Sequence, residues 1–98
     1  MNDNINEILE QRAKTHGDFK DHAYLSQILK NTFYSKRPNC DREELPYTQK
    51  EALAMIFHKI ARIGAGNPNE IDHWRDIAGY ALLVVRELES DKDNESGI

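Results

Sequence analysis

Apolar residues recur along this chain at spacings of three and four, the pattern of helices that bury one face. The pattern predicts four helices and no strand, over residues 4–14, 19–34, 49–63 and 70–88. Gly17 and the segment 64–69 interrupt the pattern and are the expected breaks between helices. Gly17 is expected to end the first helix, and Asp18 to cap the second. Thr48, with Glu51 three residues later, predicts a capping box at the third helix.

The breaks between helices are short, which favours antiparallel neighbours. The fourth segment is apolar over more than half of its circumference, so we expect it to be central in the domain or buried in a subunit contact. Residues 89–98 are polar, charged and aperiodic, which predicts a disordered tail. The sequence therefore predicts an all-α protein, a compact four-helix bundle in a single domain over residues 1–88. A chain of 98 residues buries only about 60–65% of its unfolded surface, so it gains from self-association.

The net charge of the chain argues against one class of binding partner. With a formal net charge of -4 and a pI near 5.5, the chain is a poor candidate for binding a nucleic acid polymer by neutralising its phosphates. No apolar run approaches the roughly 18–20 residues that span a bilayer, and the N-terminus does not resemble a secretion signal. We therefore expect a cytoplasmic protein without a membrane partner. The single cysteine, Cys40, rules out an internal disulfide and an all-cysteine metal site.

Carboxylates and basic residues are concentrated around the third break. Asp72 and Asp76 are four residues apart and share a face of the fourth helix. An antiparallel hairpin of the last two helices brings Lys59 and Arg62 near them, and it places Glu51 at the far end. Such paired carboxylates suit Mg²⁺, which takes oxygen ligands and substrate phosphates. Acids in a first helical turn also simply complement the helix dipole or pair with nearby arginines, and spacing alone leaves both interpretations open.

The histidines and the first break carry weaker signals. His16, His22, His58 and His73 have no zinc-site spacing, so packed or partly exposed histidines are the simpler interpretation. The Gly17-Asp18 step is ordinary helix-capping chemistry, although it also presents Asp18 and helix-start amides to an anion. Motifs of phosphate-binding loops, dinucleotide-binding folds and serine hydrolases are absent from the sequence.

Three motifs together resemble a known group of proteins. They are R…THGDF at 12–19, KEALAMI…KIARI at 50–63, and GNP…DHWRDIAGY at 66–80. Over about residues 8–86 the sequence resembles small phage and prophage proteins similar to the all-α nucleoside triphosphate pyrophosphohydrolases, the MazG-like superfamily. Where that superfamily has E-E-x-x-E on one helix and E-x-x-D on the next, this sequence has the single acid Glu51 and then D-x-x-x-D.

The resemblance implies a function. It implies a four-helix hydrolase, dimeric or tetrameric, that uses Mg²⁺ or Mn²⁺ to cleave an NTP or dNTP into a monophosphate and pyrophosphate in the bacterial cytosol. Carried over to matching positions, Glu51 and Asp76 are the expected catalytic acids, and Asp72 joins them as a metal ligand. Lys59 and Arg62 are the expected phosphate contacts, and the local pattern at the first break adds Asp18 to the substrate-binding residues. The alternative is a non-catalytic helical phage protein that serves as a dimerisation or partner-binding module.

Overall fold

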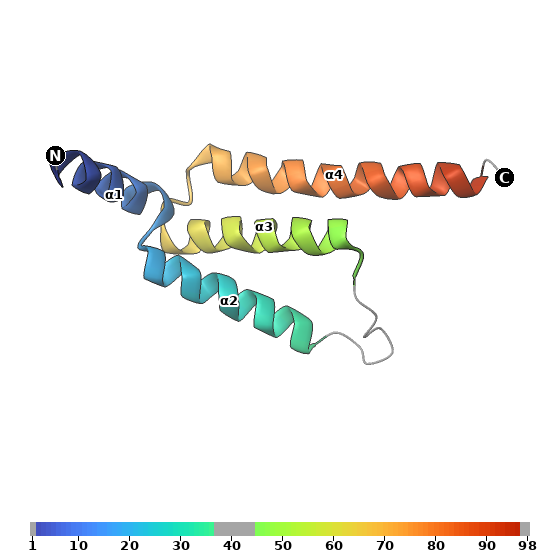
Figure 1. Cartoon of the computed structure of the whole chain (residues 1–98), viewed down its shortest axis with the longest axis horizontal. Helices are drawn as coiled ribbons and strands as arrows, with labels where there is room; N and C mark the ends of the chain where they lie inside the picture. Colours follow the sequence, from blue (N-terminus) through green and yellow to red (C-terminus); the bar gives the residue numbers. More distant parts are fainter. Residues whose placement is uncertain (1, 37–44, 97–98) are drawn as a thin grey trace.

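The computed structural model describes residues 2–36 and 45–96, and these residues form four α-helices (Figure 1). The helices are α1 (Asn2–His16), α2 (Phe19–Ser35), α3 (Tyr47–Ala65) and α4 (Ile71–Ser96). No strand occurs in these two ranges, so the all-α prediction is confirmed. None of the described helices is both long and apolar enough to cross a bilayer.

The break at Gly17 follows the prediction. Gly17 has a φ of 82°, and its amide N–H donates to the Ala13 carbonyl oxygen at 2.8 Å, which is how a glycine ends a helix. Asp18 occupies the N-cap position of α2, where its backbone carbonyl accepts the amide N–H of His22 at 3.0 Å. Its carboxylate makes no capping bond. That side chain therefore remains available for other contacts.

Two predicted helix ends were wrong. At α3, Pro46 takes the N-cap position and its carbonyl accepts the Lys50 amide N–H at 2.9 Å. Thr48 therefore lies inside the first turn, and the predicted capping box with Glu51 does not form. At the other end of the chain, α4 continues to Ser96 through much of the expected disordered tail, and residues 97–98 lie outside the described part. The segment 89–96 contains no glycine or proline that would stop the helix before Gly97, and its two glutamates and one lysine are good helix formers.

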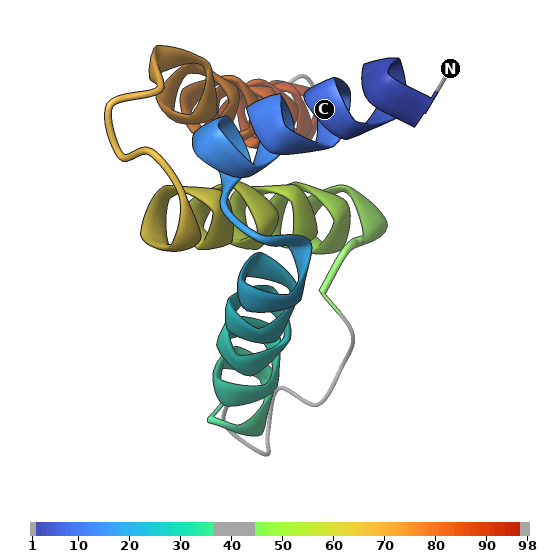
Figure 2. The same cartoon turned by 90° about the vertical axis from the view of Figure 1, so that its left-hand side faces the viewer.

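The helices form an open arrangement around α3. This helix packs against the other three, whereas α4 packs lengthwise against α3 and, within the described residues, meets α1 through His73 in its first turn. Figure 2 shows α1 and α4 on one side of α3 and α2 on the opposite side. The radius of gyration is 17.3 Å, against about 13 Å for a compact domain of this size. Ala52 and Ala61 are the buried apolar side chains of the described residues, so a single chain does not close the bundle.

Two turns pack directly against each other, and we call this contact the glycine junction (Gly17 and Gly66). A Cβ atom on Gly66 would lie 2.5 Å from the Gly17 nitrogen, and one on Gly17 would overlap the carbonyl of Ala65. The Asn67 amide N–H also donates to the Thr15 carbonyl oxygen at 3.2 Å. The backbones therefore approach more closely than any side chain would allow, and this contact joins the α1–α2 turn to the end of α3.

Replacing Gly17 with alanine is expected to destabilise the protein by about 2 kcal/mol or more, because the new methyl group adds left-handed backbone strain to a steric overlap. Gly64→Ala is the matched control. Its Cβ would lie 3.3 Å from the flexible end of Leu25, at a helical position where alanine is preferred to glycine. Urea unfolding measures both variants. Equal stabilities of Gly17→Ala and Gly64→Ala would show that the junction does not require glycine.

Candidate functional site

A cavity of about 520 Å³ lies beside the glycine junction, between α1, the start of α2 and the end of α3. We call it the basic pocket. Its polar lining consists of two arginines, three histidines and one aspartate: Arg12, His16, Asp18, His22, His58 and Arg62. Apolar side chains at its edge include Leu9 and Phe19, both well exposed. The two arginines outnumber the single aspartate, so the pocket is positively charged although the whole chain is acidic.

Two arginines give this pocket its charge. Burial and the nearby charge of Arg12 lower the pKa of Arg62, which remains a cation because an arginine pKa lies far above neutral pH. The Nε of Arg62 is buried and has no hydrogen-bond partner among the described residues. Within the described ranges neither arginine forms an ion pair. A buried, charged donor without an acceptor is costly, so the pocket is suited to accept an anion.

The three histidines of the pocket are held neutral. Burial, and then the charge of Arg62, lowers the pKa of His16, His22 and His58. The rings of His22 and His58 meet edge to face with centroids 5.7 Å apart. Like Arg62, His22 has a buried ring nitrogen, Nδ1, without a partner. At neutral pH these rings therefore offer hydrogen-bonding groups and do not add to the positive charge.

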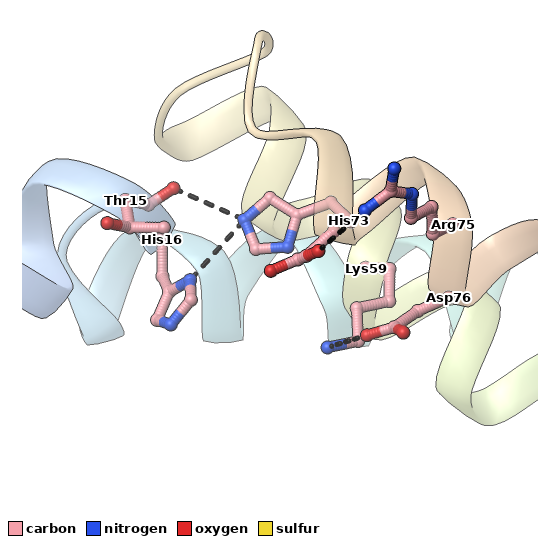
Figure 3. Close-up of polar contacts among 7 residues, drawn as sticks. Thr15, His16, Lys59, His73, Arg75 and Asp76 are labelled. Atoms are coloured by element: carbon pink, nitrogen blue, oxygen red, sulfur yellow. Dashed lines mark hydrogen bonds and ion pairs between the residues drawn. The ribbon is translucent and has the colours of Figure 1, made fainter.

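An ion pair lies next to the basic pocket. Lys59 Nζ is 2.9 Å from Asp76 Oδ2, and the lysine side chain is 13% exposed whereas the aspartate is 47% exposed (Figure 3). The hydrogen bond and charge of Lys59 lower the pKa of Asp76, so the carboxylate is ionised at neutral pH. The charge of Asp76 also acts on Arg62, which connects this pair electrostatically to the pocket.

His73 fixes α4 against the glycine junction. It is 2% exposed, and its Nε2 lies 3.2 Å from the Thr15 carbonyl oxygen and 3.3 Å from His16 Nδ1 (Figure 3). Because a carbonyl oxygen only accepts hydrogen bonds, the proton of His73 is on Nε2. The ring therefore links the start of α4 to the last turn of α1 and sets where Asp76 lies relative to the pocket.

The remaining predicted carboxylates lie elsewhere. Asp72 is 3.8 Å from Arg75, in an exposed pair one turn apart. Glu51 lines a separate groove of about 580 Å³ with Tyr80, Val84 and Glu87. In the described part of the chain no group of three acidic, histidine or cysteine side chains could hold a metal ion. Glu51, Asp72 and Asp76 are therefore not brought to one point within this chain.

The structure thus brings together four of the six predicted site residues, in two neighbouring pairs. The antiparallel hairpin is confirmed, since Lys59 meets Asp76, and Glu51 is level with the later turns of α4. Asp18 and Arg62 line the same pocket. The pocket histidines His16, His22 and His58 were predicted only to be packed or partly exposed, without a role in a site. The one clue in the sequence is that His58 lies one helical turn before Arg62, so both side chains share a face of α3. No sequence pattern indicates that α1 and α2 bring further basic groups to that turn.

The neutral histidines predict that the folded protein becomes less stable as the pH falls. Because their pKa values are lowered in the folded protein, the unfolded chain binds more protons below about pH 6.5, and stability falls as the pH drops through that value. We expect the melting temperature to decrease between about pH 7.5 and 5.5, above the range in which carboxylates titrate. Each kcal/mol lost corresponds to about 4–8 °C.

The double variant His22→Gln/His58→Gln removes two of the titrating groups, so its melting temperature should vary less over the same pH interval. Scanning calorimetry at both pH values measures the difference. A steeper dependence in the variant than in the natural protein would contradict the assignment of these histidines as buried and neutral.

Comparison with known proteins places the chain in a family. Searches of curated proteins and of solved structures return no significant match. A family model matches residues 1–88, which include all of α1, α2 and α3 and most of α4. The chain therefore belongs to the family described as a domain of unknown function, DUF6378.

Proposed function

We propose that the basic pocket binds the phosphate groups of a nucleoside triphosphate and that the protein hydrolyses this substrate to a monophosphate and pyrophosphate. The observation that carries the proposal is the half-buried Arg62, whose buried Nε has no partner among the described residues, with Arg12 beside it in a cavity of about 520 Å³. The motif resemblance to the MazG-like pyrophosphohydrolases supports the choice of substrate class. A phage-encoded enzyme of the bacterial cytosol fits this proposal.

Arginine is well suited to this task. Its planar guanidinium donates two parallel hydrogen bonds to a phosphate, and it keeps its charge when buried. Arg12 and Arg62 provide two such groups, and Lys59 provides a third cation close to them, as the lowered pKa of His16 reflects. A triphosphate with its metal carries enough negative charge to satisfy these groups. Binding it therefore relieves the repulsion between the two arginines.

The carboxylates fit a metal ion that arrives with the substrate. Mg²⁺ or Mn²⁺ is commonly held by one or two carboxylates together with substrate phosphates and water. Asp76 is half exposed beside the pocket, and Asp72 lies one turn earlier on the same helix, so these two residues would hold the ion. The bound ion supplies charge neutralisation and a water of lowered pKa. Glu51 has no part in this arrangement within one chain, because it lines a different groove.

The residues of the chain then have distinct roles. Arg12 and Arg62 position the phosphates, and Asp18 at the pocket edge limits how the substrate enters. Lys59 holds Asp76 ionised and oriented, through the hydrogen bond that lowers the pKa of this carboxylate. Together with Asp72, Asp76 would hold the metal ion that supplies the attacking water. Catalysis then rests on positioning and on charge neutralisation, without a covalent intermediate.

The test is release of pyrophosphate from each common NTP and dNTP with Mg²⁺ or Mn²⁺. Asp76→Asn should reduce the rate at least about 100-fold, since charge stabilisation at the metal is worth several kcal/mol. Arg62→Ala removes hydrogen bonds to a charged group, worth about 1.5–3 kcal/mol, so it should weaken kcat/KM about 10- to 150-fold. Lys36→Ala is the control, because this exposed cation follows α2 at the end away from the pocket.

If Lys36→Ala and Arg62→Ala lowered kcat/KM equally, the effect would come from the change in net charge and not from the pocket. No turnover with any nucleotide, together with no binding of inorganic triphosphate by calorimetry, would reject the proposal.

A partner-binding module is the second candidate. The specific observation in its favour is the number of large apolar side chains that the described chain leaves exposed, on α1 as well as on α4. A protein of this kind would show no nucleotide turnover, and Asp76→Asn would leave its assembly unchanged. The enzyme assay above therefore distinguishes the two candidates.

A further inference from the structure

His22 is a buried side chain of the basic pocket to which the proposed hydrolysis assigns no role. It is 6% exposed, and its Nδ1 has no hydrogen-bond partner among the described residues. A ring nitrogen in this position is costly, because it has given up its hydrogen bond to water and has received none in return. An apolar ring of the same shape would fill the space without that cost. The nitrogen therefore indicates a ligand that supplies the missing hydrogen bond.

The neighbours of His22 restrain its ring inside the pocket. Phe19 on the same helix meets it edge to face with ring centroids 5.2 Å apart, and His58 of α3 does so at 5.7 Å. All three side chains line the basic pocket, and so does Arg62, one helical turn after His58. In the described chain, the Nε of Arg62 is the other atom of this lining that is buried without a partner. Two such groups, one from α2 and one from α3, therefore share one cavity.

Cations outnumber acids around the rings of His22 and His58. The titratable and charged groups come from three helices: Arg12 and His16 of α1, Asp18 and Lys30 of α2, and Lys59 and Arg62 of α3. Burial and then Arg62 lower the pKa of both rings, and Asp18 is the single acid in the described lining of the pocket. On α4, Asp76 is already bound by Lys59. An oxyanion would supply the negative charge that favours the cationic form of these rings.

An oxyanion beside Nδ1 of His22 requires a proton on that nitrogen. Deprotonated phosphate and sulfate oxygens only accept hydrogen bonds, and a neutral imidazole carries its proton on one nitrogen alone. The protonated ring donates from both nitrogens and adds a positive charge, so it binds an anion more strongly. A ligand that prefers the protonated ring must also raise the affinity of the ring for its proton, because the coupling is reciprocal.

We infer that His22, supported by His58, is a phosphate-binding residue of the basic pocket and takes up a proton from solvent when an oxyanion binds beside Arg62. The inference rests on the phosphate-binding part of the proposed function and not on the hydrolysis. It makes the affinity of the pocket for phosphate groups increase as the pH falls. The bound anion should therefore offset the loss of stability at acid pH that the neutral histidines predict.

Sulfate is the probe, because it keeps both of its charges over the range in which histidines titrate, about pH 5.5 to 8. Proton NMR follows the histidine rings of the natural protein through this range with sulfate and with chloride at equal ionic strength. The pKa of His22 should be higher in sulfate. Sulfate affinity measured by calorimetry should be at least about fivefold greater at the acid end of the range than at the alkaline end, as is usual for coupled sites.

Two substitutions separate the hydrogen bond from the proton. His22→Asn keeps a polar amide near the position of Nδ1 but cannot be protonated, so sulfate affinity should be nearly independent of pH. His22→Phe keeps a ring but removes the nitrogen, so it should bind sulfate weakly throughout the range. Lys36→Ala is the matched control, since it removes a positive charge at the end of α2 away from the pocket and should keep the natural pH dependence. Melting curves without sulfate establish that each variant is folded.

The outcomes distinguish this inference from the proposed hydrolysis. Sulfate or inorganic triphosphate that binds without raising the pKa of His22 would overturn the inference and leave phosphate binding in place, with a trapped water as the partner of Nδ1. Binding with proton uptake but no turnover of any nucleotide would support the inference and reject the hydrolase. If neither anion bound at any pH in the range, both proposals would be wrong. The NMR titration uses the natural protein, so these outcomes do not depend on the folding of a variant.

Discussion

The contact between the backbones at Gly17 and Gly66 is the constraint on which the arrangement of this protein depends. It joins two turns that are almost fifty residues apart in sequence, and it leaves no room for a side chain on either residue. Because Gly17 also ends α1, the direction of α1 and its contact with α3 are determined at the same point. His73 adds α4 to this contact through the Thr15 carbonyl. Three helices are therefore positioned by one small set of backbone atoms.

This constraint explains how an acidic chain comes to contain a basic pocket. Arg12 and Arg62 belong to different helices, and only the glycine junction brings their charges close enough for Arg12 to lower the pKa of Arg62. The same approach buries the histidines, so their neutral forms are favoured. Lys59 is paired with Asp76, whereas Arg12 and Arg62 form no ion pair with the described residues. The net charge is a sum over the whole chain, so it does not reveal that two arginines gather in one pocket.

Features that depend on residues close together in the sequence could be predicted from the sequence alone. The four helices, the glycine break and the meeting of Lys59 with Asp76 follow from periodicity, from Gly17 and from an antiparallel hairpin. The capping box failed because Pro46 starts α3 earlier, and the expected tail from Glu89 is helical because nothing before Gly97 interrupts it. The pocket could not be predicted, since it requires the tertiary contact between α1 and α3. Spacing within one helix carries no information about that contact.

Helix α4 is divided lengthwise. His73, Ile77, Tyr80 and Val84 follow one stripe towards α3, whereas Trp74, Ala78, Ala81 and Val85 follow a neighbouring stripe and are exposed in the described chain. Because the first stripe holds α4 against α3, it also places Asp76 beside Lys59, next to the basic pocket. Substitutions on the exposed stripe should therefore leave the contacts of Lys59 and His73 in place, whereas substitutions on the first stripe should move Asp76 relative to the pocket.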